Sequence, residues 1–302
     1  MNNFINSIFQ PGFFSSGPVH TALFVGGTAA IVSSVVGIFT VIRGQAFAGH
    51  SLADVSSAGG SASYLLGINP LLGFLGMAIL GAGSMELVGV EKARGRDLAT
   101  GVVFGAGLGL AALFLYLDVT TTSTSGATVA VLFGSMFAIP SSTVILVVLV
   151  GSATLAVMVV LYRPLLLSSL NPEIAAVQGI HVRLVGMLQM LILGSAVALS
   201  AISVGAILST ALLIGPAATA LRIAKRPGFA VWLAALVGLG TTWIGILLAY
   251  DSTGWISGHN WPVSFLIVTL VFLVYLIARP RSGHRGSITS KETSIPLPTS
   301  RP

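Results

Sequence analysis

The chain has 302 residues, of which 55% are hydrophobic and only 7% are charged. A soluble domain carries about a quarter charged residues, so this composition excludes a soluble globular protein and indicates a chain that lies in lipid. The absence of cysteine excludes disulfides and thiolate metal sites. The net charge of +6 does not predict a nucleic-acid partner, because the basic residues interrupt apolar runs instead of forming one patch.

Nine apolar stretches are long enough to cross a bilayer as helices, which takes about 20 residues each. They cover residues 19–42, 46–67, 71–90, 98–117, 141–162, 184–201, 203–221, 229–250 and 262–278. A further stretch at 127–139 is too short to span, and we expect a re-entrant or surface helix there. The chain is thus predicted to be an all-α polytopic membrane protein with about nine transmembrane helices and a transmembrane domain over 19–279.

The basic residues predict the orientation of these helices. With the N-terminus outside, all fourteen Lys and Arg residues fall in inner segments, at Arg43, 91–97, 163–183, 222–228 and from 279 onward. This distribution follows the positive-inside rule, and it puts the C-terminus inside the cell.

The two ends of the chain are not predicted to form a second folded domain. Residues 1–18 have no basic region and no small-residue cleavage site, so we expect an external N-terminal segment and not a cleaved signal. Residues 280–302 are rich in Ser, Thr, Pro and Arg, so we expect a disordered cytoplasmic tail.

Ionisable residues at membrane depth are costly and usually functional, and few occur here. His50 and Asp54 lie four residues apart in the second stretch, so a helix places them on one face. Asp54 is ~16 Å along a helix from the inner boundary at Arg43, which is near the bilayer midplane. Imidazole and carboxylate are ligands for Zn²⁺, Mn²⁺ and Fe²⁺. The pair is therefore a candidate metal site, and a His–Asp contact that only joins helices is the alternative.

Four other ionisable residues receive no assigned role. Glu86 lies about one turn from the inner end of its stretch, where it can either line a pathway or reach the interface. His20, Asp251 and His259 fall at the outer face, where an ordinary loop residue is favoured over one that receives metal. The chain has no Gly-x-x-x-x-Gly-Lys and no His-Glu-x-x-His sequence, so we expect neither a P-loop of its own nor enzymatic activity.

A glycine stripe on the fourth stretch predicts close packing of that helix. Gly101, Gly105 and Gly109 recur every four residues on the fourth stretch, and such a stripe lets helices approach closely, either within one subunit or between two.

The longest inner segment predicts a short cytoplasmic helix. Pro164 is expected to stop the preceding helix. Asn171, Pro172 and Glu173 then supply an N-cap, a proline at the first position and an acid in the first turn, and Gly179 supplies a C-cap. A short helix in this place is either a docking element for a soluble partner or a plain connector.

Four blocks are distinctive and occur in order between about residues 20 and 280: Arg43 to Gly67, Leu132-Phe133-Gly134-Ser135, Asn171-Pro172-Glu173 and Ser203 to Ala220. Together they resemble the membrane permeases of zinc, manganese and iron ABC importers. That family usually has Asp at the position of Asn171. It usually has Gly-Asp-Ala-Leu-Ser-His on the second span, where this chain has Gly49-His50-Ser51-Leu52-Ala53-Asp54. The acid and the imidazole have exchanged places, but their spacing is kept.

The resemblance implies a type II-like ABC importer permease in the cell inner membrane, which moves a divalent transition-metal ion. It implies a homodimer in lipid with the ion passing between the subunits, a cytoplasmic ATPase docked on residues 171–179, and an external solute-binding protein. It also implies His50 and Asp54 as ligands of the ion in transit, with no permanently bound cofactor. Two alternatives stay open: a permease for a metal chelate such as a siderophore or cobalamin, and a membrane scaffold or sensor that transports nothing.

Overall fold

The computed structural model describes residues 12–88, 93–122, 125–252 and 261–278, and the regular elements within these ranges are all helical. In chain order they are η1 (Phe13–Ser15), α2 (Gly17–Ile42), α3 (Ala46–Leu66), α4 (Pro70–Val88), α5 (Ala93–Leu117), η2 (Asp118–Thr122), α6 (Ser125–Phe133), η3 (Met136–Ala138), α7 (Ser141–Leu170), α8 (Pro172–Val177), α9 (Val182–Val204), α10 (Ala206–Ile223), α11 (Pro227–Asp251) and α12 (Val263–Ile277). The chain forms helices because in lipid each backbone N–H and C=O group must be paired within its own segment.

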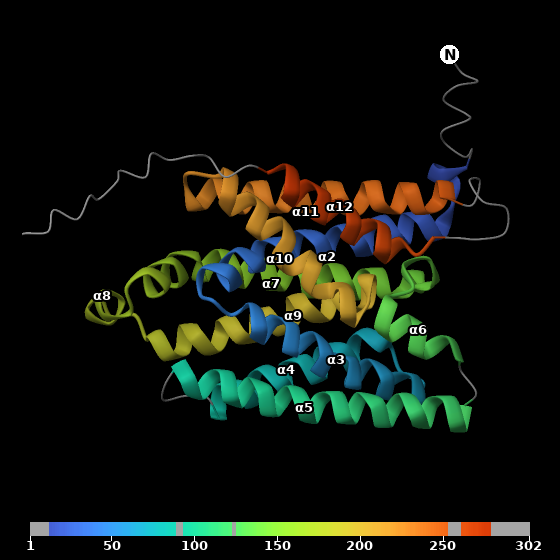
Figure 1. Ribbon diagram of the computed structural model, residues 1–302, viewed down its shortest axis with the longest axis horizontal. Helices are drawn as coiled ribbons and strands as arrows, with labels where there is room; N and C mark the ends of the chain where they lie inside the picture. The colour runs from blue at the N-terminus through green and yellow to red at the C-terminus, as the bar shows by residue number, and fades with distance from the viewer. Residues whose placement is uncertain (1–11, 89–92, 123–124, 253–260, 279–302) are drawn as a thin grey trace, which may run out of the picture.

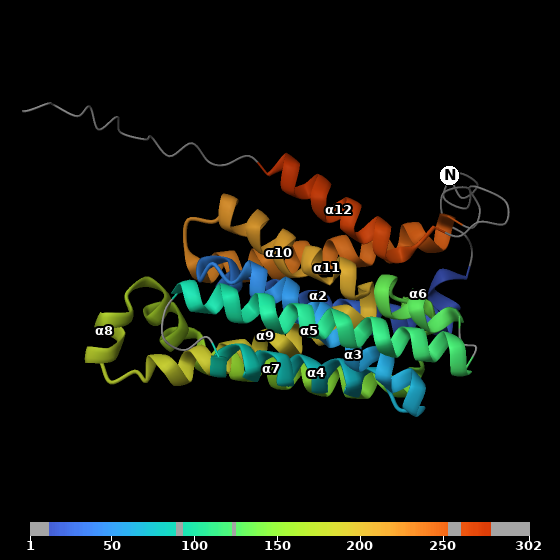
Figure 2. The same cartoon turned by 60° about the horizontal axis from the view of Figure 1, so that its bottom comes forward.

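The long helices lie side by side in one bundle, with α8 at one end and α6 at the other (Figures 1 and 2). We call these the α8 end and the α6 end. The turn between α2 and α3 and the turn between α10 and α11 also lie at the α8 end (Figure 1).

Each of the nine predicted stretches coincides with a helix: α2, α3, α4, α5, α7, α9, α10, α11 and α12. Within the described residues, seven of these helices are long and apolar enough to cross a membrane. The other two are α3, which is rich in Ser and Gly, and α12, which has 15 residues. The chain is therefore an all-helical, multi-pass membrane protein.

The expectation that Pro164 stops the fifth span is wrong. Helix α7 continues through Pro164 to Leu170. A proline removes only one intrahelical hydrogen bond, and neighbouring helices commonly tolerate this in membrane proteins. Beyond the proline, the side chains of Leu165 and Ser168 are buried, and this packing holds the last turns of the helix in place.

The apolar stretch 127–139 forms two short pieces, α6 and η3, separated at Gly134. At nine residues, α6 is too short to span a bilayer. It packs against α3, α9 and α10 at the α6 end. Residues 1–11, 279–302 and His259 lie outside the described part of the chain.

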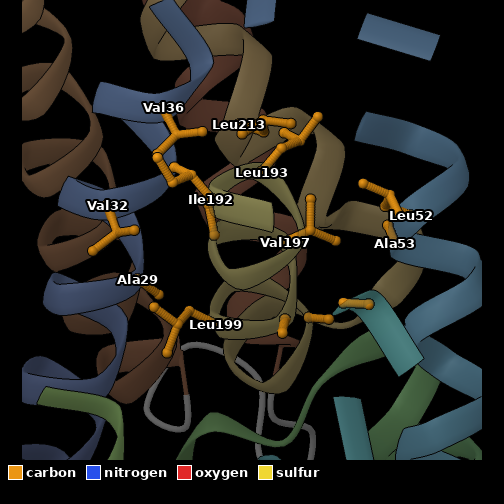
Figure 3. Packing of buried hydrophobic residues seen from close by; sticks show 14 of the residues in the cluster. Ala29, Val32, Val36, Leu52, Ala53, Ile192, Leu193, Val197, Leu199 and Leu213 are labelled. Atoms are coloured by element: carbon orange, nitrogen blue, oxygen red, sulfur yellow. The ribbon is translucent and has the colours of Figure 1, made fainter. Parts of the chain in front are cut away.

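Helix α9 forms the centre of the bundle and contacts α2, α3, α4, α7 and α10. Figure 3 shows its side chains Ile192, Leu193 and Val197 between those of α2 on one side and those of α3, including Leu52, on the other. The side chains of Leu52 and Leu193 are fully buried. This core fixes the faces of α3, since the side that packs on α9 cannot also carry the candidate ligands.

Two pairs of glycines let backbones touch. A Cβ atom on Gly59 of α3 would lie 2.0 Å from the carbonyl oxygen of Gly73 on α4, so any side chain there would separate these helices. Gly205, at φ +92°, breaks α9 from α10, and its Cβ position lies 2.4 Å from the Leu132 carbonyl oxygen. Two of the four distinctive blocks, around Gly134 and Gly205, therefore meet in space.

Candidate functional site

Most of the polarity of α3 is satisfied within the helix itself. All five of its serine hydroxyls donate to the carbonyl three or four residues earlier: Ser51 to Phe47, Ser56 to Ala53, Ser57 to Asp54, Ser61 to Ser57 and Ser63 to Gly59. Such local bonds are usual for serine in helices. In the first half of α3, the polar side chains that turn toward other groups are His50 and Asp54.

His50 and Asp54 contact each other, as their spacing predicts. Nε2 of His50 lies 3.6 Å from Oδ2 of Asp54. The other ring nitrogen, Nδ1, lies 3.0 Å from Oγ1 of Thr210 on α10. The ring of Phe104 on α5 has its centre 6.2 Å from that of the imidazole. The orientation of the imidazole is thus set by three helices.

The distance between Nε2 and Oδ2 suits two ligands of one metal ion. Bonds of about 2.0–2.2 Å at tetrahedral angles place two ligand atoms about 3.4 Å apart. Because Thr210 occupies Nδ1, Nε2 is the nitrogen that remains for an ion. Within the described residues, no group of three or more His, Cys, Asp and Glu side chains is placed to hold a metal. One protomer therefore offers two ionisable ligands, and other ligands must complete the shell.

The pair lies at the surface of the protomer. The side chain of His50 is 45% exposed and that of Asp54 is 13% exposed. Next to them, Thr210 lines a groove of about 350 Å³ between α10 and α12. The other residues that line the groove are Ala211, Ile214, Gly215, Ala218, Val268, Val271, Phe272 and Tyr275. Ionisable residues of membrane proteins face a bundle interior or an aqueous cavity, so we do not expect this face to lie against lipid.

The other ionisable residues singled out in the sequence are not part of this pair. Glu86 lies in the last turn of α4, and its Oε1 atom is 3.8 Å from the position of a Cβ atom on Gly186 of α9. His20 is exposed, and its Nε2 atom lies 2.7 Å from the Phe14 carbonyl oxygen. His259 lies outside the described residues.

Three polar residues near the bundle ends or the site were not predicted from the sequence. Asp251 was expected as an exposed residue at the outer face but is only 4% exposed, and Asp118, which follows the fourth predicted stretch, is fully buried. Each follows directly on a long apolar run, and that position was the available signal. Thr210 has no sequence signal of this kind, because its role depends on the contact between α10 and α3.

The predicted caps of the short helix α8 are both present. Oδ1 of Asn171 accepts hydrogen bonds from the N–H groups of Glu173 (3.1 Å) and Ile174 (3.0 Å). Gly179 has φ +81°, and two N–H groups that follow the helix bond back to it at 3.0 Å, which is a Schellman cap. Glu173, Ile174 and Val177 are exposed at the end of the bundle. The helix therefore presents a rigid mixed apolar and acidic surface.

Comparison with known proteins identifies the family. The ABC 3 transport family matches residues 18–279. The chain belongs to this family. Among its relatives, the chain is 28% identical to the manganese transport system membrane protein MntC of Listeria innocua over 91% of its own length and 96% of that protein. It is 26% identical to the high-affinity zinc uptake system membrane protein ZnuB of Haemophilus influenzae, over 76% of its own length and 88% of that protein.

The fold of this ABC 3 family member is also found in solved structures. One is PsaBC from Streptococcus pneumoniae in complex with Fab, with a TM-score of 0.76 and 24% identity, covering 92% of this chain and 94% of that one. Another is an inward-facing conformation of a putative metal-chelate type ABC transporter, with a TM-score of 0.64 and 18% identity, covering 86% and 85%. At these identities the likeness establishes the fold alone.

Proposed function

We propose that this chain is the membrane subunit of an ABC importer that moves a divalent transition-metal ion into the cell. The observation that carries the proposal is the His50–Asp54 pair, a nitrogen and a carboxylate ligand 3.6 Å apart on the exposed face of a membrane helix. Membership of the ABC 3 transport family supports transport, and the names of the relatives support manganese or zinc as the cargo. Nitrogen and oxygen ligands suit these ions.

In the proposed topology all nine long helices cross the membrane, with the N-terminus outside. Support comes from the α8 end of the bundle, which holds the α2–α3 turn, α8 and the α10–α11 turn. These segments and the helix ends that adjoin them contain Arg43, Arg163, Arg183, Arg222, Lys225 and Arg226. By the positive-inside rule the α8 end then faces the cytoplasm. Helix α3 crosses despite its serines, because their hydroxyls bond to its own backbone.

The ion path is proposed to run between two copies of the chain. The exposed imidazole of His50 lies beside Thr210 on a face that suits protein better than lipid. Two protomers that meet on this face bring together two imidazoles and two carboxylates, a ligand set that can surround one tetrahedral ion. Such a site must also release its ion, so water or backbone oxygen is expected to replace some of these ligands in transit.

The energy for transport is proposed to come from a separate cytoplasmic ATPase. The capped helix between Asn171 and Gly179 is its proposed docking element, since it is rigid, exposed and placed at the end of the bundle. A solute-binding protein would deliver the ion at the α6 end. In this scheme the permease forms no covalent intermediate and holds no permanent cofactor.

The proposal is tested by deleting the gene and measuring the manganese, zinc and iron content of the cells. We expect one of the three metals to fall and its addition at high concentration to restore growth. Loss of growth on a siderophore or on cobalamin instead would identify a chelate permease. Unchanged contents of all three metals would contradict a metal importer and favour a scaffold or sensor.

A further inference from the structure

Arg43 lies at the turn between α2 and α3, the helix that carries His50 and Asp54. It is the C-cap residue of α2, and its backbone N–H donates to the Phe39 carbonyl at 2.9 Å. Only two residues separate it from α3. The first of these, Gly44, has φ +66°, and the Gln45 N–H returns to the Thr40 carbonyl at 2.8 Å. This turn is short and internally bonded, so a displacement of Arg43 must be passed on to the start of α3.

The side chain of Arg43 reaches the helix that precedes α8. Its Nη1 atom donates to Oγ of Ser168 at 3.2 Å. Ser168 is 4% exposed and lies in the last turn of α7, three residues before the cap residue Asn171. This bond is partly buried, and a hydrogen bond from a charged group is stronger than one between neutral groups. The hydrogen bond therefore links Arg43 to the last turn of α7, directly before α8.

The same side chain also lies against the helix that follows α8. Nη2 of Arg43 and Oε1 of Glu86 are both 3.8 Å from the position of a Cβ atom on Gly186, in the second turn of α9. The side chains of Arg43 and Glu86 both approach Gly186 from α2 and α4. Arg43 thus bonds to α7 and lies near α9, the two helices that flank α8.

One turn further along α9, the side chain of Gln189 is fully buried, and neither its oxygen nor its nitrogen has a hydrogen-bond partner among the described residues. The buried Oε1 atom of Gln45 has none either. Buried polar atoms without partners are costly. This polar region therefore has hydrogen-bonding capacity that the described part of the protomer leaves unused.

We propose that Arg43 couples the docking helix α8 to the helix that carries His50 and Asp54. This inference rests on the proposed function, because it takes α8 as the ATPase contact and α3 as the ion-binding helix. When the ATPases move α8, α7 and α9 move with it, and Arg43 transmits that movement through Ser168 and the Gly186 contact to the start of α3. His50 lies little more than one turn into α3. A tilt of this first turn therefore changes the distance between the His50–Asp54 pairs of the two protomers.

The sharpest test compares two neighbouring serines. Ser168 and Ser169 both donate to the Leu165 carbonyl, but only Ser168 accepts the bond from Arg43. The permease is purified with its ATPase, reconstituted in vesicles and supplied with its solute-binding protein, and manganese uptake and ATP hydrolysis are measured together. Ser168→Ala should lower manganese taken up per ATP hydrolysed by about tenfold, the effect of one lost hydrogen bond to a charge. Ser169→Ala should leave this ratio unchanged. Equal ratios in the two variants would overturn the proposal.

A second variant tests the arginine itself. Arg43→Gln should keep ATP hydrolysis and lose most uptake, whereas Arg163→Gln, an exposed charge on α7, should keep both. Uptake and hydrolysis that fall together in Arg43→Gln would mean a folding or docking defect and would contradict coupling. Failure of the proposed function looks different: the unmodified complex would then show no ATP-dependent uptake of manganese, zinc or iron at all.

Discussion

The imidazole of His50 is oriented by contacts from two sides, and each ring nitrogen has its own partner. Asp54 lies at Nε2 and Thr210 at Nδ1. Groups that bond the far nitrogen of a metal-binding histidine fix its orientation and tune its basicity.

Thr210 should therefore contribute to ion binding without touching the ion. Thr210→Val keeps the shape of the side chain and removes the hydroxyl, and we expect manganese uptake to weaken by about tenfold, mainly through a higher KM. Thr210→Ser keeps the hydroxyl and should retain most activity. The measurement is a concentration series of uptake in vesicles. If the valine and serine variants had the same KM, Thr210 would be a packing residue only.

At the scale of single residues, the sequence predicts part of the candidate metal site. The four-residue spacing of His50 and Asp54 was enough to place them in contact, because helical geometry alone decides it. Thr210 and Arg43 could not be predicted, since their contacts join residues 160 and 125 positions apart in the chain. Such contacts depend on how the helices pack, which hydrophobic periodicity does not specify.

At the scale of single elements, α8 is the clearest case of local sequence deciding structure. Its caps at Asn171 and Gly179 formed as predicted, because both depend on residues within two turns. The expectation that Pro164 ends the helix was wrong for the opposite reason. Its effect on α7 depended on the burial of Leu165 and Ser168, which is a tertiary property.

If α8 docks the ATPase, reversing its exposed charge should weaken the complex. Glu173→Arg is expected to lower the amount of ATPase that copurifies by about tenfold, as for a charge reversed at an interface. Asn171→Asp keeps the cap and restores the residue usual in the family, so it should bind normally. Normal copurification and transport by Glu173→Arg would show that α8 is a connector.

The structure argues against one explanation of the glycine stripe on α5, namely close packing of helices within one subunit. A Cβ atom on Gly101, Gly105 or Gly109 would meet no atom within 4 Å, so the stripe does not pack within the described part of the protomer. Gly105→Leu should therefore lower the dimer fraction if α5 lies at the subunit contact. Gly76→Leu on α4 is a matched control, because that position is also open. The oligomeric state is measured by cross-linking in native membranes, and equal dimer fractions for both variants would remove α5 from the interface.

At the scale of the whole molecule, composition and hydropathy predicted the helical membrane architecture, and membership of the ABC 3 transport family agrees with it. In the described part of the chain, only seven helices meet simple criteria of length and hydropathy. Helix α3 does not, and it is the one that carries the candidate ligands. A helix that lines an ion path must be polar on one face, so the residues that suit it to transport also weaken its signal as a membrane span.

The central claim is that His50 and Asp54 bind the ion during transport. The direct measurement is uptake of radioactive manganese or zinc by vesicles that contain the complete importer with His50→Ala, Asp54→Ala or the control Ser57→Ala, whose hydroxyl bonds only to its own helix. We predict that each ligand variant loses uptake while its expression and dimer formation stay normal, and that the control transports normally. Uptake at the unmodified rate by either ligand variant would contradict the account and leave the pair as a contact that holds α3 in place.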